Sequence, residues 1–169
     1  MKAKLIIEDK EIEIEISEEE YKKLQPPEEK RTGYERVAEN CDFYYEFANG
    51  RVESGFDERC FIDDAYYESA NYYSSETVAE NNARADKLMR QLRRFAVEHR
   101  THEIDIGNMS TNKYYIIYDY EDNALSTSYA IYSKFFGIIY FDSRETANAA
   151  IDKFRDELIW YFIEYKDSL

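Results

Sequence analysis

The sequence has little of several residue types and motifs that build known functional sites. It contains five glycines and two prolines in 169 residues, and no P-loop, GxGxxG, GxSxG or HExxH pattern occurs. Cys41 and Cys60 do not form a CxxC pair, which favours a reduced, cytoplasmic setting. No stretch approaches the roughly 20 apolar residues that span a bilayer, and residues 1–10 lack the apolar core of a signal peptide. These absences favour a protein that is not an enzyme, with no cofactor, no metal and no membrane contact.

Acidic and aromatic residues are what the chain has in excess. It holds 36 acids against 22 bases, a net charge of −14, together with 17 Tyr and 10 Phe. A field of this sign repels a phosphate backbone and attracts basic partners. The charge is unevenly spread, because residues 41–80 hold ten acids and two bases whereas residues 81–100 hold two acids and six bases. We therefore expect the two segments to have different binding roles.

The N-terminal residues predict a small ββα module over residues 1–24. Ile12, Ile14 and Ile16 alternate with glutamates, a period of two that is typical of a half-buried strand, and they follow an apolar run and a polar turn. Ser17 and Glu20 have the spacing of a capping box and predict a short helix that ends near Leu24. Residues 25–32, with two adjacent prolines, are expected to be a linker.

The remaining chain reads as two copies of one plan, separated by a linker at residues 101–112. In residues 33–100 an aromatic strand runs into Asn49-Gly50, a strong hairpin signal, and a helix is predicted from Glu76 to about His99. In residues 113–169 strands are followed by a helix from Arg144 to about Tyr165. The junctions Tyr73–Ala79 and Phe141–Ala147 align without a gap, with Ser75 and Ser143 as the expected N-caps. The sequence thus predicts an α+β fold with two similar units, each a small antiparallel sheet with one helix.

An acidic aromatic stretch is the first candidate binding site. Carboxylates spread over a rigid surface can imitate the phosphates of a nucleic acid, and tyrosines supply contact area at low entropic cost. The simpler explanation is a solvated acidic loop whose aromatic side chains form a core. The residues assigned to the site are Asp57, Glu58, Asp63, Asp64, Tyr66, Tyr67 and Glu68.

The helix that follows carries a second candidate site, a basic face opposite its apolar one. Five clustered bases favour contact with an RNA or DNA backbone, whereas the simpler explanation is a solvated face or one paired with the acidic stretch. The bases are Arg84, Lys87, Arg90, Arg93 and Arg94.

The C-terminal helix is apolar nearly all round over Leu158–Ile163. Burial between the two repeats is the first explanation, and a homodimer through this helix is the second. His99, His102 and Glu103 have a weak metal-ligand spacing, and a histidine at a helix C-terminus explains them more simply.

The two aligned junctions, together with Asn82–Ala96 and Ile139–Ser143, resemble a group of small proteins carried by phages and other mobile elements of Firmicutes. In that group an aromatic strand, F-x-[S/T] and an acidic-capped helix recur, often twice. Some mobile-element proteins of this size and acidity are anti-CRISPR inhibitors. The resemblance, which covers about residues 33–169, implies an inhibitor acting in the cytoplasm of a bacterial host cell on a basic partner, with Cas9 or its guide-RNA complex as the best guess. It supplies no catalytic residues.

Two further classes of function stay open. An RNA or ribonucleoprotein contact would act through the basic helix, and a phage structural or assembly protein would oligomerise through the C-terminal helix.

Overall fold

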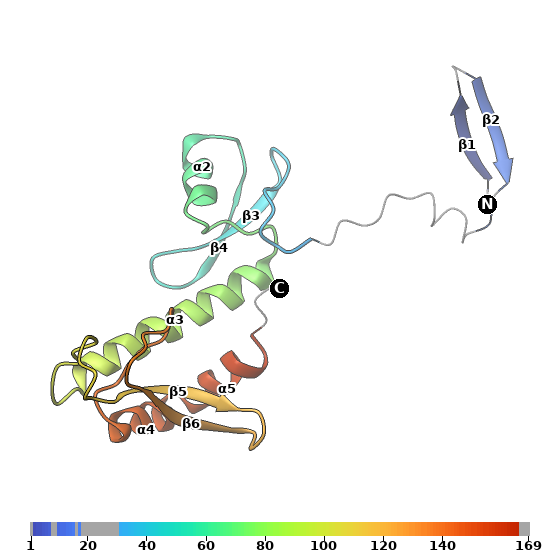
Figure 1. Cartoon of the computed structure of the whole chain (residues 1–169). Helices are drawn as coiled ribbons and strands as arrows, with labels where there is room; N and C mark the ends of the chain where they lie inside the picture. Colours follow the sequence, from blue (N-terminus) through green and yellow to red (C-terminus); the bar gives the residue numbers. More distant parts are fainter. Residues whose placement is uncertain (1, 8–9, 16, 18–30, 166–169) are drawn as a thin grey trace. The chain divides into compact units, whose positions relative to one another are not determined.

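The N-terminal hairpin comes first in the computed structural model, which describes residues 2–7, 10–15, 17 and 31–165 (Figure 1). Strands β1 (Lys2–Ile7) and β2 (Lys10–Glu15) pair antiparallel, with Leu5 opposite Ile12. This confirms the predicted hairpin. The predicted helix after Ser17, and the linker up to residue 30, lie outside the described residues. The chain divides into two compact units, Met1–Thr32 and Gly33–Leu169, and the second carries every element described below.

The first repeat is built on the predicted hairpin. Strands β3 (Asp42–Glu46) and β4 (Val52–Phe56) pair antiparallel, and Gly50 in the connecting turn has a φ of +80°, a conformation that a residue with a side chain rarely adopts. Tyr73 adds a bridge on the other side of β3, because its amide and carbonyl each bond to Tyr44 at 2.9 and 2.8 Å. Helix α3 (Glu76–Glu98) follows within the predicted bounds.

The second repeat follows the same order. Strands β5 (Lys113–Asp119) and β6 (Ala124–Ala130) form the hairpin, and Phe141 bridges to Tyr114 just as Tyr73 bridges to Tyr44. Ser143 then precedes α4 (Arg144–Lys153). The ungapped alignment of the two junctions therefore corresponds to the same backbone contacts, and the α+β class with paired strands and helices is confirmed.

Two elements differ from the prediction. Helix α2 (Phe61–Glu68) lies where the sequence indicated only an acidic aromatic stretch, and the single C-terminal helix is divided at Phe154 into α4 and α5 (Arg155–Ile163). Phe154 has a φ of −115° and a ψ of 22°, although hydrogen bonds still run through it from Leu158 and to Ala150. Its ring lies edge-on to Phe95 at 5.8 Å, so this position serves the packing against α3.

Helix α3 belongs to both repeats (Figure 1). Near its start, Ala79 and Ala83 are buried where it packs on β3 and β4. Further along, α3 enters a core with the second repeat, whose alanines let the helices approach closely. This core contains Leu88, Leu92, Phe95, Ala96, Phe141, Ala147, Ala150, Ile151 and Leu158. The boundary predicted at residue 100 therefore separates the strands of the two repeats but not their hydrophobic cores.

Leu158 and Trp160 are buried where α5 packs on α3 and β6, whereas Ile163 at the end of α5 is 49% exposed. Among the described residues, no helix is long and apolar enough to cross a membrane.

Candidate functional site: the α2 surface and its surroundings

Asp57, the first residue assigned to the acidic site, is completely buried. Arg36 donates two hydrogen bonds to its carboxylate, from Nε to Oδ2 at 2.8 Å and from Nη2 to Oδ1 at 3.1 Å. The hydroxyl of Tyr72 donates to Oδ2 at 2.8 Å, and the amide of Arg59 donates to Oδ1 at 3.0 Å. Asp57 therefore organises the first repeat from inside and does not reach a partner.

The electrostatics of this group follow from its contacts. The Arg36 hydrogen bonds hold the pKa of Asp57 well below its usual range, against the opposing effect of burial, and the same pairing raises the pKa of Arg36. Burial, followed by the neighbouring Asp57 carboxylate, raises the pKa of Tyr72 to about 12. At neutral pH the group is thus an ionised carboxylate held by a guanidinium and a neutral phenol.

Two more of the assigned acids also have roles within the fold. Asp63 is buried at the third position of α2, where its Oδ2 accepts hydrogen bonds from the amides of Cys60 and Glu58. This is the carboxylate half of a capping box, and it explains why the chain turns into a helix here. Asp64 is half exposed and pairs with Arg36 at 2.7 Å. Asp57 and Asp63 are therefore not part of a surface site on α2.

The assigned tyrosines lie partly in an aromatic core. Tyr66 packs within 4.4 Å of Tyr45 between ring centroids, and Phe43 stacks on Tyr72 at 4.3 Å. Tyr67 contacts the edge of Tyr72 at 5.4 Å and is still 43% exposed. The simpler explanation of the aromatic residues is thus correct for Tyr66, whereas Tyr67 is available on the surface.

The residues of this region that reach solvent are apolar side chains and acids, and we call them the α2 surface. They are Glu58, Phe61, Ile62, Asp64, Ala65, Tyr67 and Glu68. Phe61 is 80% exposed and Ile62 is 52% exposed, and both line a shallow hollow with Ala65. Phe61, Ala65 and Glu68 follow one another at helical spacing and so share a face of α2. The sequence analysis assigned the acids and Tyr67 to the site but neither Phe61 nor Ile62, whose exposure depends on a helix that was not predicted.

The basic face of α3 is only partly free. Arg84 binds both carboxylate oxygens of Glu157 and lies 4.0 Å from the centre of the Trp160 ring, so it ties α3 to α5. Arg90 donates to Glu46 of β3 at 2.6 Å. Both residues match the simpler explanation, in which the bases pair with neighbouring acids.

Three bases on α3 keep their charge toward solvent. Arg94 lies 3.9 Å from Glu98 and is largely exposed, whereas Lys87 and Arg93 are exposed and form no ion pair with any residue that the structure describes. Of the five bases assigned to this site, only Lys87, Arg93 and Arg94 therefore stay candidates for a nucleic-acid contact.

The histidines at the end of α3 serve as caps and packing groups. His99 stacks on Phe95 at 3.9 Å, and its Nδ1 lies 3.0 Å from the Phe95 carbonyl oxygen. His102 lies 3.6 Å from Asp142. Within the described part of the chain, no three His, Cys, Asp or Glu side chains come together as metal ligands.

Asp142 is a buried carboxylate at the second junction. Burial opposes its ionisation, but hydrogen bonds from the amide and hydroxyl of Thr101 to Oδ2, at 2.6 and 2.8 Å, lower its pKa to about 2. The Thr146 hydroxyl and the His102 amide also face the carboxylate, yet Oδ1 has no hydrogen-bond partner among the described residues. The aligned position in the first repeat is Ser74, so this carboxylate distinguishes the two repeats.

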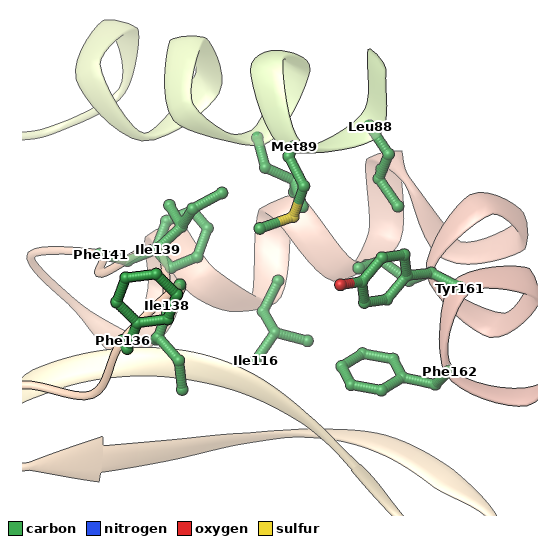
Figure 2. Close-up of a pocket in the computed structure, with 12 residues that line it drawn as sticks. Leu88, Met89, Ile116, Phe136, Ile138, Ile139, Phe141, Tyr161 and Phe162 are labelled. Atoms are coloured by element: carbon green, nitrogen blue, oxygen red, sulfur yellow. The ribbon is translucent and has the colours of Figure 1, made fainter. Parts of the chain in front are cut away.

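A cavity of about 290 Å³ lies between α3 and the second repeat (Figure 2). Met89 of α3, Ile116 of β5, and Tyr161 and Phe162 of α5 point into it, and Phe136 and Ile138 close one side. All of its side chains are apolar except for the hydroxyl of Tyr161, whose oxygen points toward the centre (Figure 2). This cavity could not be predicted from the sequence, because its walls come from four separate segments.

Comparison of the chain with models of protein families, with curated proteins and with solved structures found no match.

Proposed function

We propose that this chain is a stoichiometric inhibitor from a mobile element that binds a basic, DNA-handling surface of a host defence nuclease, with Cas9 as the specific candidate. The observation that carries the proposal is the α2 surface. Phe61 and Ile62 stand exposed on a short helix, with Glu58, Asp64 and Glu68 around them. Interfaces concentrate their binding energy in such aromatic anchors, surrounded by a polar rim.

The mechanism follows from charge. The arginines and lysines with which a nuclease holds DNA are arranged for phosphates, and carboxylates can form the same charge-assisted hydrogen bonds. The net charge of −14 steers the molecule to such a surface, and Phe61 then anchors it. The choice of Cas9 depends on the resemblance of the two strand-to-helix junctions to mobile-element proteins.

The first test is a pull-down of the tagged protein with purified Cas9, with and without guide RNA, followed by a DNA-cleavage assay. Binding and blocked cleavage support the proposal, and guide dependence separates DNA mimicry from interference with guide loading. No binding in either state would remove Cas9 as the target.

A pair of charge reversals tests the α2 surface itself. We expect Glu58→Lys with Glu68→Lys to abolish binding to the nuclease, because both carboxylates are exposed beside the apolar patch. The matched control is Glu121→Lys with Asp122→Lys, which changes the net charge equally at the exposed β5–β6 turn. Equal losses in both pairs would show that only total charge matters, and full binding by the first pair would refute the surface.

The alternative is an RNA contact through the three bases of α3 that face solvent. Its discriminating variant changes Lys87, Arg93 and Arg94 to Ala, leaving the ion pairs of Arg84 and Arg90 intact. Salt-dependent RNA binding that disappears in this variant would favour the alternative over the inhibitor.

A further inference from the structure

The second repeat has a surface whose composition is unlike that of the rest of the chain. Residues 124–141 contain no Asp or Glu, and Lys134 is their one charged side chain, in a molecule of net charge −14. Several large side chains of this segment are exposed: Tyr129, Tyr132, Phe135 and Phe136. We call Phe136, with the cavity that it borders, the acid-free face, because no Asp or Glu among the described residues lines this cavity.

Phe136 is a protruding group on this face. Its side chain is fully exposed, and the residue also lines the rim of the 290 Å³ cavity (Figure 2). Gly137 follows with a φ of +76°, and a Cβ added there would meet nothing within 4 Å, so the rim around this residue is open. An aromatic side chain and an apolar cavity therefore lie next to each other on one face.

We propose that the acid-free face joins two copies of this chain across a two-fold axis, with Phe136 of each copy seated in the cavity of the other. A two-fold interface is self-complementary: if a group on one copy fits a hollow on the other, the reverse contact forms as well. A protruding group next to a hollow of suitable chemistry is what such an interface requires. An apolar cavity of roughly 150 Å³ holds a benzene molecule, so this cavity accommodates a phenyl ring together with neighbouring contacts.

The absence of acids around the cavity, in the part of the chain that the structure describes, permits a second copy as its occupant and disfavours a basic partner or a nucleic acid. Two molecules of net charge −14 repel each other, so a contact between them has to form where acids are absent, and no described Asp or Glu lines this cavity. A basic partner gains nothing from a surface without carboxylates, and a nucleic acid finds only Lys134 there. The hypothesis that the C-terminal helix makes a dimer contact is thereby refined, because α5 contributes Leu158, Tyr161 and Phe162 to the cavity wall.

Solution mass at several concentrations tests the dimer. We expect the full chain to show a dimer mass, and Phe136→Asp to weaken dimerisation by about 30-fold or more, which is the scale of an interface anchor residue at about 2 kcal/mol. The matched control is Phe61→Asp, an equally large change at the exposed aromatic residue of the α2 surface, which should leave the dimer intact. A monomer mass at every concentration, or a dimer unaffected by Phe136→Asp, would overturn the proposal.

A second measurement locates the contact. A photo-crosslinking amino acid in place of Phe136, in a mixture of isotopically light and heavy chains, should join the two chains at β5 or α5. Crosslinks confined to single chains would contradict the exchange of Phe136 between copies. The dimer is independent of the proposed function, because Phe136→Asp should preserve nuclease binding while Phe61→Asp removes it.

Discussion

The buried Asp57 carboxylate joins segments of the first repeat that lie apart in the sequence. Arg36 and Tyr72, which are 21 and 15 residues away in the sequence, donate to it together with the amide of the nearby Arg59, and Asp57 is completely buried. A buried charge of this kind is tolerated only because all of its partners are present. Its role is therefore to fix the positions of the segments around β4, and not to contribute a large net stability.

Asp57→Asn should lower the free energy of unfolding by roughly 2 kcal/mol. Arg36 loses its charged acceptor, and the NH₂ group of the new side chain points its hydrogens at donors that an Asp57 oxygen accepts from. Urea denaturation measures this change. Glu58→Gln, one residue away and exposed, is the control and should change stability by no more than about 0.5 kcal/mol. Equal stability of wild type and Asp57→Asn would contradict the assigned role.

The same substitution should alter the pH dependence of stability. The folded-state pKa of Asp57 lies below its ordinary value of 3.8, so its contribution is fully present above that pH and is lost as the pH falls toward the folded-state pKa. Wild type should therefore lose stability on acidification below about pH 4, and Asp57→Asn should lose less.

At the scale of elements, the aligned serines before α3 and α4 differ in one hydrogen bond. The Ser143 hydroxyl accepts from the Thr146 amide at 3.1 Å, whereas Ser75 forms no side-chain bond to cap its helix. Ser143→Ala should therefore destabilise the fold by about 1 kcal/mol, and Ser75→Ala by clearly less. Thermal unfolding of the two variants side by side checks this, and equal losses would show that the hydrogen bond does not matter.

The elements that could be predicted from sequence are those with local signals. Asn49-Gly50 marks the first hairpin, and the long amphipathic pattern marks α3. Helix α2 was missed because it has only eight residues and begins after Cys60, which is not one of the usual N-cap residues, so its capping box with Asp63 became recognisable only in the fold. The division at Phe154 was missed because neither Pro nor Gly marks it.

The candidate site was harder to predict for a related reason. The sequence identified a region of acids and aromatic residues, and the α2 surface lies within it. It could not show which acids face inward, because Asp57 is buried through Arg36, a residue 21 positions earlier in the chain. Long-range partners decide burial here, and no local spacing encodes them.

At the scale of the whole molecule, α3 joins the two repeats of the unit Gly33–Leu169 through one hydrophobic core. Leu88 and Leu92 of the first repeat's helix lie in one core with Phe141 and Leu158 of the second. If either repeat unfolds, it exposes the apolar side of α3 to water. Exposing apolar surface to water costs roughly 25 cal/mol for each square ångström. Because this cost arises whichever repeat unfolds, it couples the stabilities of the two repeats.

We therefore expect residues 33–169 to unfold in a single transition. Trp160, the one tryptophan, reports on the second repeat, and a fluorophore on the exposed Cys41, with Cys60 changed to Ser, reports on the first. The two probes should give coincident urea transitions. Leu92→Ala should lower the free energy of unfolding that both probes report by about 2–5 kcal/mol. Arg93→Ala, on the exposed side of α3, should change neither value. Separate midpoints for the two probes would mean that each repeat folds on its own, and that the shared core does not transmit stability between them.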